Sequence, residues 1–83
     1  MRYSFRPIAM VDLSRLPYDI KERITAKLDF YFSNDDPLYF ATRLTDSQPK
    51  EYRFRIGDYR VIFEMRNGIA EILKIGNRKD IYR

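Results

Sequence analysis

Three arginines in one short segment carry the clearest chemical signal in this sequence. Residues 52–60 read YRFRIGDYR, so that basic and apolar side chains alternate. Because successive side chains of a β-strand point to opposite faces, Arg53 and Arg55 lie together on one face of the predicted strand. If the Gly-Asp pair forms a two-residue hairpin loop, Arg60 lies directly opposite Arg55 on the next strand. Like charges at facing positions destabilise a sheet, so this arrangement indicates a binding site for a polyanion.

The distribution of charge along the chain supports a polyanionic partner. The 83 residues include 16 basic and 12 acidic side chains, which give a formal net charge of +4. Residues 1–49 contain seven of each kind, whereas residues 50–83 contain nine basic and five acidic side chains. Such an asymmetry is typical of a protein that binds nucleic acid or an acidic protein.

The absent residue types narrow the chemistry. The sequence contains no cysteine and no histidine. This excludes disulfide bonds, thiolate metal sites and catalytic pairs of histidine with serine or cysteine. Acid–base catalysis would therefore depend on Asp, Glu, Lys or Tyr. Because we find neither a signal peptide nor an apolar run of roughly 20 residues, we expect a cytoplasmic protein that does not associate with membranes.

The elements that position the arginines can be predicted from periodicity. Residues 3–8 predict a short strand, and residues 10–16 a short helix that buries Met10, Leu13 and Leu16. Pro17 suits the first turn of a second helix. The apolar residues of that second helix recur at helical spacing, namely Ile20, Ile24, Leu28, Tyr31 and Phe32. The polar run 33–37 ends it, and residues 38–49 read as a loop.

Three strands are predicted after this loop, over residues 51–57, 58–67 and 68–76. Asn67-Gly68 is a strong hairpin signal, because a type I′ turn needs positive φ at both positions. In this register Ile62 pairs with Leu73, and one face of the sheet is almost wholly apolar. That face carries Tyr52, Phe54, Ile56, Tyr59, Val61, Phe63, Met65, Ala70 and Ile72.

The opposite face combines the arginines with an aliphatic patch formed by Ile62, Leu73 and Ile75. We therefore predict a single α+β domain over residues 1–83. Its small antiparallel sheet comprises an N-terminal strand and a C-terminal three-strand meander, with two helices packed on one face.

Two segments of the chain resemble the RelE/ParE superfamily of type II toxins, and most closely its RelE branch. They are residues 52–64, YRFRIGDYRVIFE, and residues 75–83, IGNRKDIYR. The resemblance implies a RelE-like fold and a toxin that cuts mRNA in the ribosomal A site. In that family no metal or other cofactor is used, and the ribose 2′-hydroxyl attacks the adjacent phosphate. A cognate antitoxin neutralises such toxins in a toxin–antitoxin hetero-oligomer.

Five positions of this sequence match the catalytic site of the family: Arg53, Arg55, Arg60, Arg78 and Tyr82. By this resemblance Arg53 and Arg60 would hold the scissile phosphate and Arg78 would lie near the leaving 5′-oxygen. Tyr82 would stack on a nucleotide. We expect Gly76 to end or kink the last strand and turn Arg78 and Tyr82 toward the arginines. The alternative is that Ile81 and Tyr82 only pack against the edge of the sheet.

The general base is the open point of this comparison. Arg53 and Arg55 stand where the family often has lysine, and arginine stays protonated under ordinary conditions. Three alternatives follow: Tyr82, a carboxylate such as Glu51 or Asp36, or mainly electrostatic catalysis without a strong base.

Two other functions are compatible with the resemblance. One is a ParE-like poison of DNA gyrase, and the other is a degenerate member that only binds its antitoxin. The arginines and the tyrosine favour the nuclease, because the ParE branch typically lacks the full set. For the antitoxin, the aliphatic patch beside the arginines predicts an acidic, amphipathic segment that covers this face.

Overall fold

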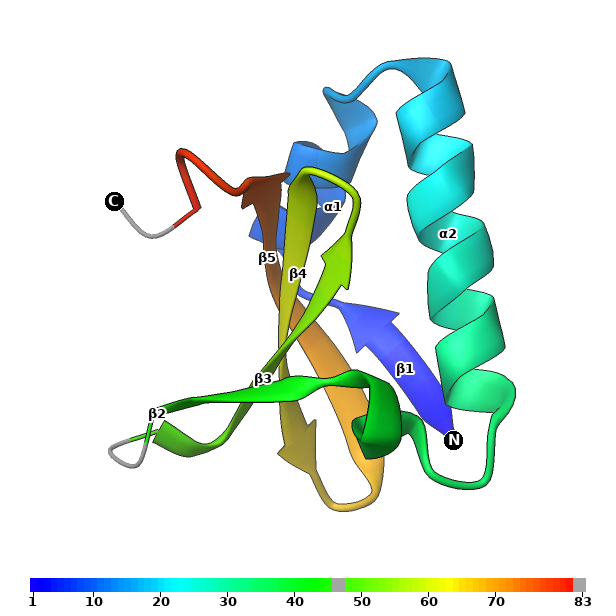
Figure 1. The fold of residues 1–83 in the computed structure, drawn as a ribbon, viewed down its shortest axis with the longest axis vertical. Coiled ribbons are helices and arrows are strands. Elements are labelled where there is room, and N and C mark those ends of the chain that lie inside the picture. Colours follow the sequence, from blue (N-terminus) through cyan, green and yellow to red (C-terminus); the bar gives the residue numbers. More distant parts are fainter. Residues whose placement is uncertain (46–47, 82–83) are drawn as a thin grey trace.

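A computed structural model describes the backbone of residues 1–45 and 48–81 (Figure 1). The elements in chain order are β1 (Arg2–Phe5), α1 (Pro7–Ser14), α2 (Tyr18–Ser33), the 3₁₀ helix η1 (Pro37–Phe40), β2 (Thr42–Thr45), β3 (Gln48–Ile56), β4 (Tyr59–Arg66) and β5 (Ile69–Asn77). The strands form one sheet in the order β1-β5-β4-β3-β2. Strands β2 to β5 are an antiparallel meander, and β1 joins β5 in parallel.

The predicted α+β architecture is confirmed, with one correction and one addition. The N-terminal strand runs parallel to β5, so the sheet is mixed and the prediction of a wholly antiparallel sheet is wrong. The predicted loop over residues 38–49 contains η1, β2 and the start of β3. Strand β2 has only four residues and pairs with β3 at the edge of the sheet, so it has little apolar pattern to reveal it.

The first helix starts three residues earlier than predicted. Strand β1 ends at Phe5, and Pro7 opens α1, where its missing N–H and fixed φ are tolerated. Leu13 and Leu16 pack against the core as predicted, and Ala9, one turn before Leu13, is fully buried. Met10 is 49% exposed, so the predicted burial of Met10 is wrong.

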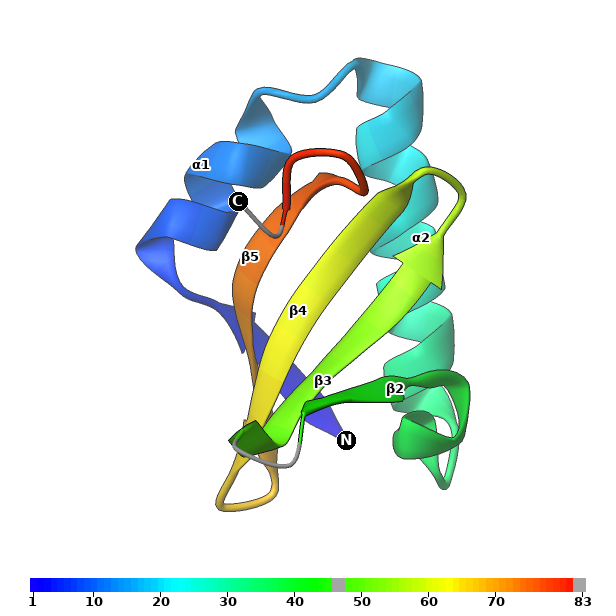
Figure 2. The same cartoon turned by 60° about the vertical axis from the view of Figure 1, so that its left-hand side comes forward.

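One hydrophobic core lies between the helices and one face of the sheet. Its apolar side chains from α2 follow the predicted spacing, with Ile24, Leu28 and Phe32 buried. All nine residues predicted on the apolar face of the sheet belong to this core or pack against it. Across β3 and β4, the rings of Phe54 and Phe63 stack with their centroids 4.6 Å apart. Because both helices cover this face, the other face of the sheet is left without a helix (Figures 1 and 2).

A β-bulge between β4 and β5 changes which side chains reach the helix-free face. The predicted pair Phe63–Ile72 is present, but Ile62 pairs with Lys74 and not with Leu73. Leu73 is the extra residue of the bulge, and beyond it the alternation is inverted. Ile75 therefore pairs with Val61 and is buried in the core at 4% exposure.

The predicted aliphatic patch of Ile62, Leu73 and Ile75 is consequently wrong. Ile75 lies on the helix side of the sheet, and Ile62 is only 7% exposed. Strict alternation assigned Leu73 and Ile75 to the helix-free face. In the structure Lys74, which lies between them in the sequence, is on that face.

Candidate nucleic-acid interface

The β3–β4 hairpin brings the three strand arginines to one face. Gly57 has a φ of 60°, which the first central residue of a type II′ turn requires. The register predicted from this two-residue turn is confirmed, since Arg55 pairs with Arg60. Arg53 pairs with Ile62, which in turn pairs with Lys74. Because the alternate residues of these strands fill the core, Arg53, Arg55, Arg60 and Lys74 share the helix-free face, called here the basic face.

Arg60 is the most constrained cation of this face. It is only 6% exposed, and its Nη1 donates hydrogen bonds of 2.9 Å to the carbonyl oxygens of Gly57 and Tyr59. Both acceptors belong to the turn that precedes Arg60, so the guanidinium is held against the end of its own hairpin. A buried cation is costly unless polar groups compensate it, and these two carbonyls supply part of that compensation. The result is a positive charge with a fixed position.

The other two strand arginines are progressively more accessible. Arg53 is half-buried between its neighbours, and Arg55 is exposed. The three side chains thus run from a buried guanidinium at Arg60 to a solvent-exposed one at Arg55. An extended polyanion on this face would meet both a fixed and an adjustable positive charge.

The segment after β5 folds back beside the hairpin turn. The amides of Asp80 and Ile81 donate to the carbonyl of Asn77 at 2.9 and 3.0 Å. The amide of Arg78 donates to the carbonyl of Asp58 at 2.8 Å, which ties this turn to the β3–β4 loop. The Arg78 and Asp58 side chains approach to 3.8 Å and are both largely exposed, so this ion pair adds little.

The position of Gly76 differs in part from the prediction. Gly76 does not end the last strand, because it pairs with Arg60 and β5 continues to Asn77. The reversal comes one residue later, in the turn drawn red in Figure 2, on the side of the sheet away from α2. Arg78 is therefore placed beside the hairpin turn that holds Arg60. Tyr82 lies outside the described residues.

Lys74 is the residue of this face that sequence reasoning missed. A signal for it was present, because strict alternation from Ile72 would have placed a lysine in the core. Of the two carboxylates considered as bases, Glu51 lies on β3 two residues from Arg53 and shares its face. Asp36 directly precedes η1, whose Phe40 stacks on Tyr31 of α2, so Asp36 belongs to the helix layer.

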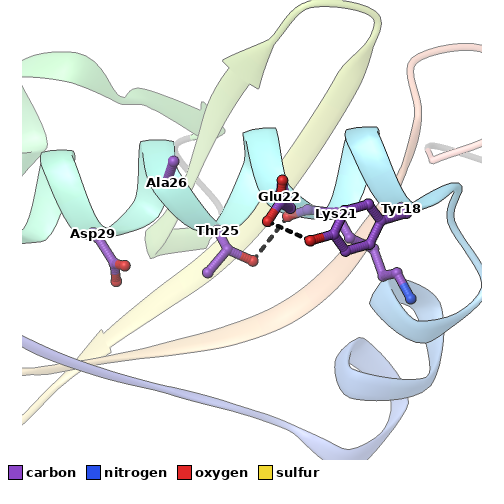
Figure 3. Close-up of a pocket in the computed structure, with 6 residues that line it drawn as sticks. All are labelled: Tyr18, Lys21, Glu22, Thr25, Ala26 and Asp29. Atoms are coloured by element: carbon purple, nitrogen blue, oxygen red, sulfur yellow. Dashed lines mark hydrogen bonds between the residues drawn. The ribbon is translucent and has the colours of Figure 1, made fainter.

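A surface groove on the opposite side of the molecule is separate from these cations. It has a volume of ≈ 500 Å³ and is lined by one stripe of α2: Tyr18, Lys21, Glu22, Thr25, Ala26 and Asp29. Within it the hydroxyl of Tyr18 donates to Glu22 at 2.7 Å and that of Thr25 to the Lys21 carbonyl at 2.8 Å (Figure 3). None of the basic-face residues lines this groove.

The described part of the chain offers neither a metal-binding cluster nor a membrane-spanning helix. Over residues 1–45 and 48–81, no three acidic side chains gather closely enough to hold a metal ion. In the same ranges no helix is long and apolar enough to cross a membrane.

A match to a family model shows which protein family the chain belongs to. The model described as the ParE toxin of type II toxin–antitoxin systems, parDE, matches residues 3–82. The chain belongs to this toxin family. No curated protein matches the sequence.

Solved structures of RelE toxins share the fold of this toxin. The RelB–RelE antitoxin–toxin complex of Methanococcus jannaschii is similar with a TM-score of 0.75 at 22% identity, over 94% of this chain and 93% of that one. The RelBE2 complex of Mycobacterium tuberculosis has a TM-score of 0.75 at 23% identity, over 93% and 96%. The archaeal RelE–RelB complex of Pyrococcus horikoshii has a TM-score of 0.70 at 25% identity, over 95% and 96%. The toxin therefore has a RelE-like fold.

Proposed function

We propose that this toxin is a ribosome-dependent mRNA endonuclease that cuts mRNA in the A site. The observation that carries the proposal is the position of Arg60. Its guanidinium is buried, held by two carbonyls, and faces away from the helices beside Arg53 and Arg55. A fixed cation on an otherwise open surface suits a charged polymer better than a small enclosed ligand.

The reaction would proceed by transfer within the RNA. The 2′-oxygen forms a bond to phosphorus while the bond from phosphorus to the 5′-oxygen breaks, which leaves a 2′,3′-cyclic phosphate and a free 5′-hydroxyl. Negative charge grows on the non-bridging oxygens, and Arg53 and Arg60 stabilise it. Arg78, beside the hairpin turn, stabilises the negative charge on the leaving 5′-oxygen, which takes up a proton from water to become the free hydroxyl. Removing one such preorganised electrostatic contact typically costs about 10²–10³ in rate.

The proton of the 2′-hydroxyl needs an acceptor. Glu51 shares the face of Arg53 and is the better placed of the two carboxylates, while Tyr82 and catalysis without a strong base are the other routes. The ribosome supplies the in-line geometry that free RNA seldom adopts, because an open face of this kind cannot orient both reacting oxygens by itself.

We further propose that this toxin acts in the cytoplasm and that a cognate antitoxin neutralises it there. The similar structures from M. jannaschii, M. tuberculosis and P. horikoshii are complexes of a toxin with its antitoxin. With Ile75 buried, an antitoxin segment on the basic face of this toxin would be held mainly by charge. An acidic segment fits that requirement.

Alanine substitutions test the nuclease proposal. Arg60→Ala and Arg78→Ala should each relieve growth arrest on expression and abolish A-site cuts mapped by primer extension on translated mRNA. Arg66→Ala is the matched control. Arg66 is also an arginine of β4, but its side chain is exposed and pairs with Glu64 at 2.9 Å. If both site variants still cut mRNA and arrest growth, the proposed site is wrong.

A poison of DNA gyrase is the second candidate, and the family model named for ParE favours it. The two functions leave different traces in the same induced culture. A damage response without new mRNA 5′ ends would support the gyrase poison, whereas A-site cuts without a damage response would support the nuclease. A chain that produced neither would fit a member that only binds its antitoxin.

A further inference from the structure

The β-bulge gives Lys74 a partner in the C-terminal turn. With Leu73 as the extra residue, Lys74 stands next to Ile62 on the basic face. Its Nζ donates a hydrogen bond of 2.9 Å to the carbonyl oxygen of Ile81. These two residues are seven positions apart, and the bond closes the turn that follows β5 back onto the strand it leaves.

A close apolar contact reinforces the same closure. The side chain of Ile81 is only 3% exposed, although it lies outside the main core between the helices and the sheet. It covers Gly76, where a Cβ atom would come within 3.1 Å of the Ile81 Cδ1. Gly76 on β5 pairs with Arg60 on β4. Ile81, which covers Gly76, therefore lies next to the strand position of Arg60. The absence of a side chain at Gly76 thus makes room for Ile81.

The turn is fixed at both of its ends. Near its start the Arg78 amide donates to the Asp58 carbonyl at 2.8 Å, and at its end Ile81 is held by Lys74 and Gly76. Arg78 lies between these anchors.

We propose that Lys74 is a positioning residue of the toxin, which clasps the turn over residues 77–81 and so fixes Arg78 relative to Arg60. This inference rests on the proposed nuclease function for its catalytic consequence. In this role Lys74 acts through the turn, because its ammonium group donates to the Ile81 carbonyl, and the cleavage assay below separates this role from that of a phosphate ligand. Loss of the clasp should slow the chemical step without weakening the binding of the toxin to ribosomes.

Three variants separate this role from a simple contribution of charge. Lys74→Met keeps the length of the side chain and removes the donor, and Lys74→Arg restores a charged donor. Gly76→Ala disturbs the same clasp from its other side, because the new methyl group would press on Ile81. Lys79→Met is the matched control, since Lys79 lies in the same turn and the substitution removes the same charge.

Hydrogen exchange of the Ile81 amide in the purified toxin tests the clasp without any RNA. This amide donates to the Asn77 carbonyl at 3.0 Å, and its protection reports whether the turn is closed. Exchange should accelerate about tenfold in Lys74→Met, as expected for the loss of one charge-assisted hydrogen bond. It should accelerate in the same direction in Gly76→Ala, and remain at the wild-type rate in Lys74→Arg and Lys79→Met. Equal protection in Lys74→Met and wild type would overturn the proposal.

Single-turnover cleavage of mRNA on ribosomes tests the consequence. The maximal rate should fall about tenfold in Lys74→Met and recover in Lys74→Arg, with the half-saturating toxin concentration unchanged. A raised half-saturating concentration with an unchanged maximal rate would identify Lys74 as a phosphate ligand and refute the clasp. If Arg60→Ala abolishes cleavage while Lys74→Met opens the turn and still cuts at full rate, the clasp exists but its proposed role in positioning Arg78 for cleavage fails. If wild-type toxin cuts no mRNA, the nuclease proposal fails, and the exchange result stands by itself.

Discussion

Replacing Arg60 by methionine should separate the two reasons why a protein would bury an arginine. The side chain is 6% exposed and donates two hydrogen bonds of 2.9 Å to backbone carbonyls. If Arg60 is mainly a structural brace, its loss should destabilise the hairpin. If it is mainly a fixed charge for a phosphate, its loss should affect the reaction far more than the fold. Methionine fills similar space without charge, so it isolates these effects.

The expected change in stability follows from two opposing contributions. Hydrogen bonds that involve a charged group contribute about 1.5–3 kcal/mol each, so the two bonds together contribute roughly 3–6 kcal/mol. Burying the guanidinium without a carboxylate costs several kcal/mol, and methionine removes that cost. We therefore expect the free energy of unfolding to change by less than about 2 kcal/mol in either direction. The rate of mRNA cleavage should fall by about 10²–10³, which corresponds to the loss of one preorganised electrostatic contact.

Urea denaturation and ribosomal cleavage would be measured on the same protein preparation. Arg66→Met is the control, because it removes the same charge from β4 at a side chain that is 63% exposed and paired with Glu64. Both its stability and its cleavage rate should stay near the wild-type values. A loss of more than about 3 kcal/mol in Arg60→Met, with unchanged cleavage per folded molecule, would show that Arg60 is a brace and refute the reasoning.

Three further predictions concern the framework of the site. Burial and the hydrogen bond that its hydroxyl donates to Asp29 raise the pKa of Tyr3 from 10.0 to about 12, so the stabilisation is complete below pH 10 and is lost as the pH rises toward 12. Unfolding midpoints should therefore converge for wild type and Tyr3→Phe over this range, and parallel curves would contradict the assignment. Asp12→Leu should cost about 1–3 kcal/mol, because the amide of buried Ile75 donates to the Asp12 carboxylate at 3.1 Å, and Asp12→Asn should cost less. Gly57→Ala and Gly68→Ala should each cost about 1–2 kcal/mol for their positive φ values of 60° and 76°. A clearly larger loss at Gly57 would show that the nearby guanidinium end of Arg23 is held in place and cannot move aside.

The parts of the fold that were predictable are those that local chemistry determines. Positive φ values at Asn67 and Gly68 confirm the second hairpin turn, and Gly57 determines the first. Once these turns are fixed, side-chain alternation places Arg53, Arg55 and Arg60 together without any tertiary information. The 3.6-residue period similarly identified the buried stripe of α2, because that helix has one apolar face.

The burial of Arg60 was not predictable, because its acceptors are backbone carbonyls. Any residue in the positions of Gly57 and Tyr59 would present the same carbonyl oxygens, so no side-chain pattern marks the interaction. The short helix α1 was predicted, but its buried face was assigned only in part, for another reason. It is apolar on several sides, with Ile8, Met10 and Val11 between 44% and 60% exposed, so periodicity cannot assign its buried face.

The bulge at Leu73 shows how a local conflict in the sequence becomes a feature of the site. Strict alternation from Ile72 would direct Lys74 into the core and expose the aliphatic side chain of Ile75. Burying an unpaired ammonium costs several kcal/mol, whereas burying an isoleucine contributes roughly 1.5–3 kcal/mol. One extra residue in β5 reverses both outcomes, since it places Ile75 in the core and Lys74 on the basic face. The bulge that completes the core thus also supplies the lysine that holds the C-terminal turn beside Arg60, and core packing and site geometry depend on the same register shift.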